Sequence, residues 1–503
     1  MFQLSGRMRD KWDEEHTADG RTYGQMTITT AITGGKKTIN DDRKAKVIQP
    51  TVDSPNCTDM GNGKRLAARH GRDLHYCPPG KKWFVWNGKL WLPDNGSEIM
   101  RRAKDTVQSI SLEIGASTDE RLRSELVRHA RSSESQARLK AMIACARSEP
   151  TIDIMPDDLD QDPWLLNCLN GTLDLRTGKL RRHRREDLMT KISPVKFNPK
   201  AECPVWIKFL RKIMGENDVL ISFLQRAIGY SLTGITWEQV LFILWGIGKN
   251  GKTTFLEVLK ALLGKDFARQ AASETFMQKA RGGQIPNDLA ALKSARFVTA
   301  PELERDQHLS ESLIKLATGE DEITARFLFG EYFSYKPQFK LWMMANHKPV
   351  IRGTDDGIWR RPMLIPFKVQ IPKPERDRQL IDKLKTELPG ILNWALQGCL
   401  TWHRDGLGIP QEVQDAGTEY RKEMDTLWGF LEERCILNPK AVTPAATIYE
   451  AYILWAEANG EANPLKLAAF GRALSDRDFG RKHLNYGWAR VGIALRPDDG
   501  VSN

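Results

Sequence analysis

The chain has 503 residues, a formal net charge of +11 and seven scattered cysteines. This length allows three or four domains, each able to bury its own core. No apolar run reaches the roughly 18 residues that a membrane span needs, and no signal-peptide pattern opens the sequence, so we predict a cytoplasmic protein without a membrane partner. The cysteines lack CxxC spacing and the histidines lack HExxH spacing, which argues against a zinc site or a disulfide framework. The basic charge favours a nucleic acid partner. The alternative interpretation is a basic protein whose lysines are merely solvated.

Short strands and helices are expected in the first half of the chain. Residues 1–50 are polar and have weak periodicity, whereas Trp83–Leu92 alternates around an Asn-Gly turn and predicts a β-hairpin. Residues 98–150 have the three- and four-residue apolar spacing of helices. Leu165–Leu180 predicts a second group of strands, and residues 206–232 predict helices with an apolar packing stripe.

Three apolar segments then alternate with helical stretches. They are VLFILW, ARFVTA and KLWMMAN, which begin at Val240, Ala295 and Lys340. Strands that alternate with helices predict a three-layer α/β domain with a parallel sheet. Residues 375–434 are predicted to be helical, and a small domain is expected at about 441–497.

The loop after the first of these strands has a phosphate-binding pattern. Gly-Ile-Gly-Lys-Asn-Gly-Lys-Thr matches GxxxxGK followed by Ser or Thr, and it leads into a helix. Glycines let backbone N–H groups surround phosphate oxygens, and the helix N-terminus adds its dipole. Lys252 would bind the β- and γ-phosphates, and the Thr253 hydroxyl would bind Mg²⁺. The predicted ATP-binding residues are Gly246, Ile247, Gly248, Lys249, Asn250, Gly251, Lys252, Thr253 and Thr254.

Polar residues follow the other two strands. Glu302 and Glu304 come after ARFVTA, and such carboxylates suit a metal ligand and a group that polarises the attacking water. We favour Glu302 as the principal acid and as a Mg²⁺ ligand beside Thr253. Asn346 ends KLWMMAN, where its amide could hold the lytic water or sense the γ-phosphate. A plain turn residue is the alternative.

Paired arginines, Arg360 and Arg361, follow an acidic turn. An arginine that reaches the γ-phosphate of a neighbouring subunit stabilises the charge that develops during phosphoryl transfer. A salt-bridged surface pair is the other interpretation. The pattern does not indicate which of the two would act.

These four blocks, in this order and within about 115 residues, resemble the superfamily 3 helicases of small viruses, phages and plasmids. The fuller resemblance is to the poxvirus-type and phage/plasmid-type primase–helicases. Segments between Thr58 and Leu180 look like the accessory domain that precedes the helicase in that family, and the tail from Ile448 looks like its winged helix. The opening, Leu4–Thr27, resembles the stretch that follows the primase–polymerase domain in phage versions.

The resemblance implies an AAA+-like ATPase that forms a homo-hexameric ring, with ATP and Mg²⁺ at each subunit interface. Such a ring would translocate 3′ to 5′ along single-stranded or forked DNA, in a bacterial host or phage-infected cell. The family's polymerising domain would lie upstream of residue 1, so we expect no primer synthesis from this chain and include a separate primase–polymerase among its candidate partners. The domains implied are a linker at 1–50, the accessory domain at 51–235, the ATPase core at 236–370, a helical lid at 371–438 and the winged helix at 439–503.

The family's DNA-contacting hairpin corresponds to residues between Glu304 and Asn346. Its basic tip is replaced here by Phe329-Gly330-Glu331. The candidate DNA contacts implied by the resemblance are Lys315, Arg326, Lys336, Arg481 and Lys482.

Two other functional classes remain open. One is a DNA-binding replication initiator that uses ATP as an assembly switch and does not unwind. The other is a protein-remodelling or defence AAA+ ATPase, whose hydrolysis would be indifferent to DNA. Strand displacement on a forked duplex distinguishes both from a helicase.

Overall fold

The chain divides into two units. The first includes residues 56–65 and 106–146, and the second includes the rest of the described chain. Within this described part, no helix combines the length and the apolar character needed to cross a membrane. The computed structural model describes residues 56–278, 287–301, 307–327, 330–353, 355–460, 464–485 and 487–497.

The first unit is helical and contains a buried polar cluster. The Asn62 side chain donates to Ser133 Oγ over 2.9 Å, and its Oδ1 lies 2.9 Å from Nε2 of His129. All three side chains are buried, and partnered buried polar groups fix how helices face one another. The helices expected at residues 98–150 are confirmed. They are α3 (Ser97–Ala116), α4 (Glu120–Ser133) and α5 (Gln136–Ala146), and α2 (Asp59–His70) begins in this unit.

Two small antiparallel sheets open the second unit, and they contain the hairpin and the second group of strands that were predicted. In the first, Trp86 pairs with Trp91 across a turn in which Asn87 Oδ1 accepts from the N–H groups of Lys89 and Leu90. Gly88 has a φ of 91°, a conformation that favours glycine. The strands are β1 (Leu74–Cys77), β2 (Lys82–Trp86), β3 (Trp91–Asp94), β4 (Leu165–Cys168), β5 (Gly171–Asp174) and β6 (Lys179–Arg181).

The central sheet has five parallel strands in the order β13-β7-β12-β9-β8. The three strands predicted from the sequence form its interior, and the two edge strands were missed. One edge strand has only three residues, and the other begins and ends with proline, which sheets tolerate at an edge. The strands are β7 (Leu241–Trp245), β8 (Ala268–Gln270), β9 (Phe297–Ala300), β12 (Lys340–Ala345) and β13 (Pro362–Pro366).

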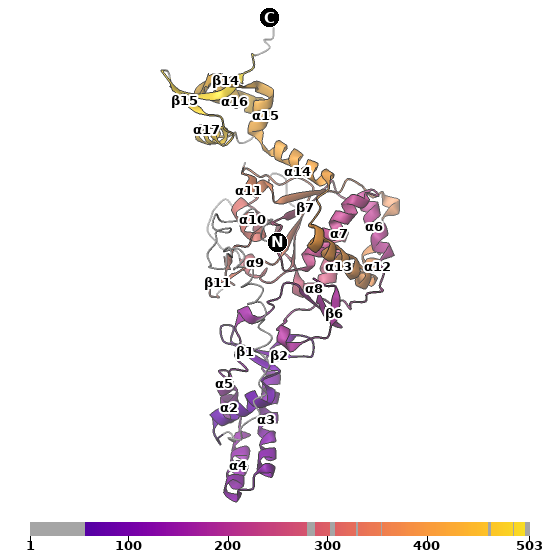
Figure 1. Cartoon of the computed structure of the whole chain (residues 1–503), viewed down its shortest axis with the longest axis vertical. Coiled ribbons are helices and arrows are strands. Elements are labelled where there is room, and N and C mark those ends of the chain that lie inside the picture. The colour runs from indigo at the N-terminus through magenta and orange to yellow at the C-terminus, as the bar shows by residue number, and fades with distance from the viewer. Residues whose placement is uncertain are drawn as a thin grey trace, which may run out of the picture. The chain divides into compact units, whose positions relative to one another are not determined.

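Each face of this sheet is covered, which confirms the three-layer α/β prediction. Phe242 and Leu244 pack with one set of helices, and Leu241 and Ile243 pack with the other set and with a β-hairpin. Figure 1 shows the two sets on opposite sides of β7. The first set is α6 (Pro204–Met214), α7 (Asp218–Leu232), α8 (Lys252–Phe267), α12 (Leu380–Thr386) and α13 (Leu388–Asp405). The second is α9 (Asn287–Ala290), α10 (Glu311–Thr318), α11 (Asp356–Trp359), α14 (Gln411–Met424) and the hairpin of β10 (Ile323–Ala325) and β11 (Phe333–Tyr335).

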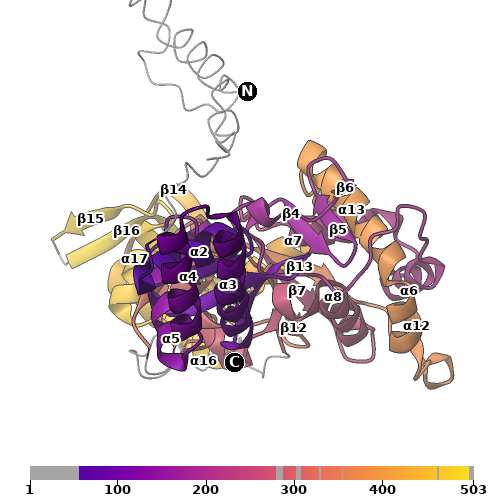
Figure 2. The same ribbon diagram turned by 90° about the horizontal axis from the view of Figure 1, so that it is seen from below.

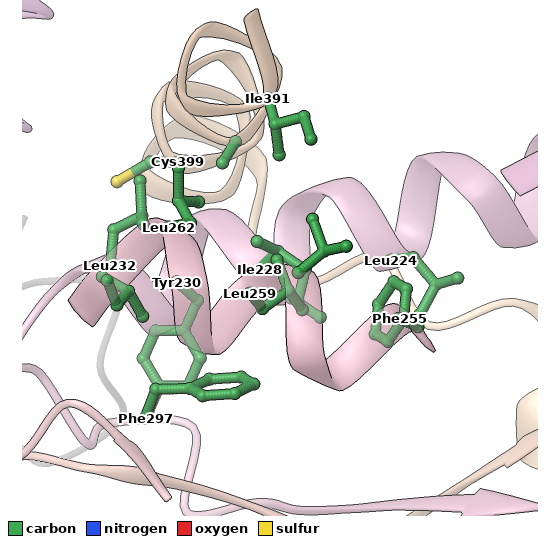
Figure 3. Packing of buried hydrophobic residues seen from close by; sticks show 14 of the residues in the cluster. Leu224, Ile228, Tyr230, Leu232, Phe255, Leu259, Leu262, Phe297, Ile391 and Cys399 are labelled. Atoms are coloured by element: carbon green, nitrogen blue, oxygen red, sulfur yellow. The ribbon is translucent and has the colours of Figure 1, made fainter. Parts of the chain in front are cut away.

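Two glycines bring α7 and α13 into backbone contact. A Cβ atom at Gly229 would collide with the backbone of Cys399, and one at Gly398 would collide with the carbonyl of Gln225. Figure 3 shows Ile228 of α7 beside Leu259 of α8 in the core that these helices share. Backbone contact without an intervening side chain makes this pair of helices a close-packed unit.

Residues on both sides of position 235 share this hydrophobic core. Trp164, which immediately precedes β4, stacks on Trp402 of α13 with ring centroids 5.9 Å apart, and the Cys399 thiol lies 3.8 Å from the Leu175 carbonyl. Figure 2 shows β5 and β6 beside α13. The second sheet and α6–α7 therefore belong to the core that supports the central sheet.

The C-terminal part has its own core, formed around Phe430, Tyr452 and Phe470. Its antiparallel sheet has the order β14-β16-β15. Helix α15 contributes Leu427, Phe430 and Leu431 to this core. In chain order the elements are α15 (Thr426–Arg434), β14 (Cys435–Pro444), α16 (Ala445–Ala458), α17 (Leu467–Ser475), β15 (Arg481–Leu484) and β16 (Gly487–Leu495).

Candidate active site

The glycine-rich loop connects β7 to α8, as its sequence predicted. Gly251 has a φ of 87° and precedes Lys252, the first residue of α8. A Cβ atom at Gly251 would lie 2.6 Å from Ile213, and one at Gly246 would collide with the Phe367 carbonyl. Both glycines therefore permit a backbone path that a side chain would block. The first N–H groups of α8 have no acceptor within the helix, which makes its N-terminus a site suited to anions.

The side chain of Asn250 holds this loop in place. It is buried, and its amide donates to the carbonyls of Ile247 and Phe367 over 3.2 and 3.1 Å. The N–H of Ile371 also donates to the Lys249 carbonyl over 2.9 Å. The loop is therefore tied to the segment that follows β13. Ile247, in contrast, is 74% exposed.

Replacement of Asn250 by alanine is expected to lower the free energy of unfolding by about 1–3 kcal/mol, because the carbonyls of Ile247 and Phe367 lose a buried donor. Urea denaturation measures this change. Ile247→Ala is the matched control in the same loop, since its exposed side chain should contribute less than about 0.5 kcal/mol. Equal effects of the two substitutions would show that the Asn250 amide does not hold the loop.

Lys252 and Asn346, which are 94 positions apart, meet beside this loop. The Lys252 ammonium donates to Oδ1 of Asn346 over 2.9 Å and also contacts the Gly246 carbonyl. The parallel register pairs Ala345 with Trp245, so Asn346 and the loop follow adjacent strands at the same edge of the sheet. The Lys252 side chain is only 5% exposed, and its charge therefore acts in a partly dehydrated environment.

The remaining predicted residues of this site are Thr253, Thr254 and the two acids. The Thr253 hydroxyl lies 3.7 Å from the Met344 sulfur, a weak acceptor that leaves its oxygen available to a cation. Glu302 and Glu304 lie outside the described residues. Strand β9, which precedes them, ends at Ala300 and pairs with β12.

A cavity of about 520 Å³ adjoins the loop. Thr254, Lys249 and Gly251 form one side of it. This cavity could not be predicted from the sequence, because its other walls come from α6 and from residues 371–383, which share no local motif. Its apolar lining consists of Val205, Phe209, Ile371 and Leu380.

The paired arginines differ in burial. Arg361 is 7% exposed, and its Nε donates to Thr318 Oγ1 over 3.0 Å while Nη1 contacts the Gly357 carbonyl. Burial, together with the neighbouring charge of Arg360, lowers the pKa of Arg361. Arg360 is exposed, and its Nη2 donates to Oε1 of Gln239 over 2.6 Å. The sequence analysis did not identify Gln239, because no motif includes it.

The predicted hairpin before Asn346 is confirmed as β10 and β11, and its tip residue Phe329 lies outside the described residues. Lys315, on α10, forms an ion pair of 2.9 Å with Asp355, and Lys336 is exposed beyond β11. The Arg326 guanidinium lies over the Tyr332 ring, 4.9 Å from its centroid.

Exposed aromatic side chains accompany these cations. Phe327 and Tyr332 are 52% and 55% exposed, and the Phe327 ring stacks on Phe333 with centroids 5.6 Å apart. The sequence analysis considered only the basic residues of this segment. The aromatic residues on either side of the tip, Phe327 and Tyr332, were the feature of the sequence from which this surface could have been predicted.

The C-terminal candidates lie together on β15. Arg481 and Lys482 are both exposed, and the Arg481 guanidinium lies 5.1 Å from the ring centroid of Trp488, which is 53% exposed. Arg490 is buried instead and donates to Ser475 Oγ and to the Phe479 carbonyl over 2.8 and 2.9 Å. Its role is to hold α17 against the sheet.

Four family models match the chain. Residues 63–215 match the D5 N terminal like family, and residues 422–487 match the Poxvirus D5 protein-like family. Residues 1–41, which lie outside the described part, match the NrS-1 polymerase HBD domain, and residues 244–361 match a family of unknown function.

Several viral proteins are similar in sequence. A protein of Acanthamoeba polyphaga mimivirus and one of Frog virus 3, both named as putative helicases, are 27% and 25% identical. A protein of African swine fever virus named as a putative primase is 28% identical. Each match covers 60% of this chain, but only 34%, 40% and 34% of the respective relative, so the chain corresponds to about a third of their length.

The apo C-terminal region of NrS-1 was found among solved structures, with a TM-score of 0.49 and 12% identity over 87% of this chain and 99% of that one. The two D5-type matches flank the central sheet, and the relatives are named for helicase and primase functions. Two segments of the chain therefore match D5-type families, and the chain is similar to viral proteins named as putative helicases and primases.

Proposed function

We propose that this chain is the ATPase motor of a superfamily 3 replicative DNA helicase, with an AAA+-like core. The observation that carries this proposal is the meeting of Lys252 and Asn346 beside the glycine-rich loop, at the carboxyl edge of a parallel sheet. Ligands of parallel α/β sheets bind at this edge. A lysine, a polar amide and a helix N-terminus together provide the groups that bind and sense a terminal phosphate.

The residues around the loop fit MgATP. The Lys252 ammonium, which donates to Asn346 and contacts the Gly246 carbonyl, would turn to the β- and γ-phosphates. Thr253 would supply one oxygen ligand to Mg²⁺, and the expected carboxylate ligand is Glu302. Bound Mg²⁺ neutralises charge on the phosphates. Asn346 would orient the attacking water, and the adjoining cavity has apolar walls on which the nucleoside could pack.

Arg360 is the proposed arginine finger, because it is exposed whereas Arg361 is buried. Strands β13 and β7 pair in parallel, from Pro362–Leu241 to Pro366–Trp245. Arg361 directly precedes β13, whereas the glycine-rich loop directly follows β7. Five residues of strand span about 16 Å. Arg360 and the loop of one subunit therefore lie at opposite ends of these paired strands, so the finger would have to serve a neighbouring subunit. This geometry favours a ring, which we propose to be a hexamer.

Two described surfaces suit DNA. The β10–β11 hairpin combines Arg326 and Lys336 with exposed Phe327 and Tyr332, and aromatic rings beside cations are typical of single-strand binding. The C-terminal order of helix, strand, two helices and hairpin supports a winged helix, with Arg481 on the wing.

Strand displacement tests this proposal. With a forked duplex, the protein should separate the strands with ATP and not with a non-hydrolysable analogue, and a 3′ single-stranded tail should suffice for loading. Hydrolysis with DNA binding but without displacement would favour an ATP-switched initiator. Hydrolysis that DNA does not stimulate would favour a protein-remodelling ATPase.

Stacking and charge at the hairpin should be separable. Tyr332→Ala should weaken single-strand binding by about 1–3 kcal/mol, since it removes one stacking ring, and should leave the salt dependence unchanged. Lys336→Ala should instead reduce the slope of log K against log salt by about 1. Fluorescence anisotropy between about 50 and 200 mM salt measures both quantities. Binding by Tyr332→Ala equal to that of the wild type would exclude the hairpin as a stacking surface.

A further inference from the structure

We propose that Gln239 is a positioning residue that sets the orientation of Arg360 for the nucleotide of the neighbouring subunit. This inference rests on the proposed trans finger. It assigns a role to a residue outside every motif of the site, in the turn before β7.

The geometry places one amide oxygen against both arginines. Gln239 Oε1 accepts from Arg360 Nη2 over 2.6 Å and lies 3.5 Å from Arg361 Nη2. The bond to Arg361 is the weaker one, and Thr318 and Gly357 already hold that side chain. Gln239 is thus the described side-chain partner of the exposed guanidinium, and it leaves the Nε and Nη1 donors of Arg360 for a phosphate.

The chemistry of an amide suits this position. Gln239 Oε1 can accept a hydrogen bond without carrying a charge, so it restricts the guanidinium while its positive charge is retained. A carboxylate at the same place would form an ion pair and compete with phosphate for Arg360. A long flexible arginine without such a partner would lose more rotamer entropy when it reached the nucleotide.

The backbone that carries Gln239 is itself held in place. Gln239 has a φ of 53°, an uncommon conformation for this residue type, and its N–H donates to the Thr236 carbonyl over 3.0 Å. The adjacent Glu238 accepts from Nε1 of Trp402 over 2.7 Å. Two residues further on, the Leu241 N–H donates to the Arg361 carbonyl over 2.8 Å. The acceptor and the finger are therefore fixed to the same pair of strands.

Steady-state ATP hydrolysis by the full chain tests this role with two variants. Gln239→Gly removes the side chain at a backbone conformation that glycine adopts without strain, and Gln239→Glu keeps the acceptor but adds a charge. For both, kcat should fall about ten- to a hundredfold, since the finger is misplaced or its charge is offset. KM for ATP should change less than about twofold, because the loop that binds the subunit's own nucleotide is untouched. Gln270→Ala is the control, because Gln270 also accepts from a cation, Lys260, over 3.0 Å, but lies on edge strand β8.

Subunit mixing separates a positioning role from a structural one. A Gln239→Gly subunit keeps its loop, and a Lys252→Ala subunit keeps its finger, so a mixture should recover activity above that of either variant alone. An unchanged kcat in both Gln239 variants would overturn the inference. The inference would also be overturned if kcat falls but mixing Gln239→Gly with Lys252→Ala restores no activity, while mixing Arg360→Ala with Lys252→Ala does. If that Arg360 mixture also fails under confirmed subunit exchange, the trans finger itself is wrong and the role of Gln239 falls with it.

Discussion

Replacement of Lys252 by alanine is expected to reduce ATP turnover at least about 100-fold, because it removes the preorganised positive charge that would stabilise the phosphoryl group during transfer. The ammonium is 5% exposed and lies in a partly dehydrated position beside Asn346. A coupled assay of ADP release measures the rate, and circular dichroism should show an unchanged helix content.

Lys260→Ala is the matched control for this variant. Lys260 lies on the same helix, α8, but it is at the surface, where its ammonium pairs with Glu257 over 2.6 Å. Turnover by Lys260→Ala should match that of the wild type. If Lys252→Ala retained turnover within a few-fold of the wild-type rate, the loop would not be a nucleotide site.

Arg360→Ala and Lys252→Ala, each nearly inactive, are expected to regain activity when mixed. The first variant keeps a complete loop and the second keeps a complete finger, so some interfaces of a mixed ring combine both. Arginine fingers contribute about 10³-fold or more to phosphoryl transfer, which makes the recovery easy to detect. ATPase titration at constant total protein measures it, after subunit exchange has been confirmed with a tagged pull-down.

Arg361→Ala gives the contrasting result. Its loss leaves the buried Thr318 hydroxyl and the partly buried Gly357 carbonyl without their donor, so we expect a lower free energy of unfolding, by about 1–3 kcal/mol, in addition to any kinetic effect. Activity that stays at the background of the separate variants, with exchange confirmed, would refute a finger that acts in trans. Rescue of Arg361→Ala but not of Arg360→Ala would mean that the finger is Arg361.

Local patterns in the sequence predicted the centre of the fold and the loop. The strands β7, β9 and β12 are continuous apolar segments, as expected for strands buried on both faces, and the glycine-rich motif needs only neighbouring residues to be recognised. The edge strands were not predictable in this way. Strand β13 is held by the parallel register with β7, which its two prolines do not interrupt, and no local propensity reveals that pairing.

The roles within the site depended on contacts that are distant in the sequence. Arg360 and Arg361 are adjacent and chemically equal, and only the placement of Thr318, 43 positions earlier, determines which of them is buried. Asn250 lies within the glycine-rich motif, yet its side chain serves the loop by contacting Phe367. The sequence also could not indicate Gln239, because its relation to Arg360 arises only when β7 and β13 pair.

The glycine contact between α7 and α13 has a mechanical consequence for the proposed motor. Sliding of one helix over another usually requires side chains between them to change rotamer, and at Gly229 and Gly398 there are none to change. The layer of α7 and α13, which supports α8, should therefore be the rigid part of each subunit of the proposed ring. We expect any displacement that begins at the glycine-rich loop to be transmitted through the other layer, where the β10–β11 hairpin packs.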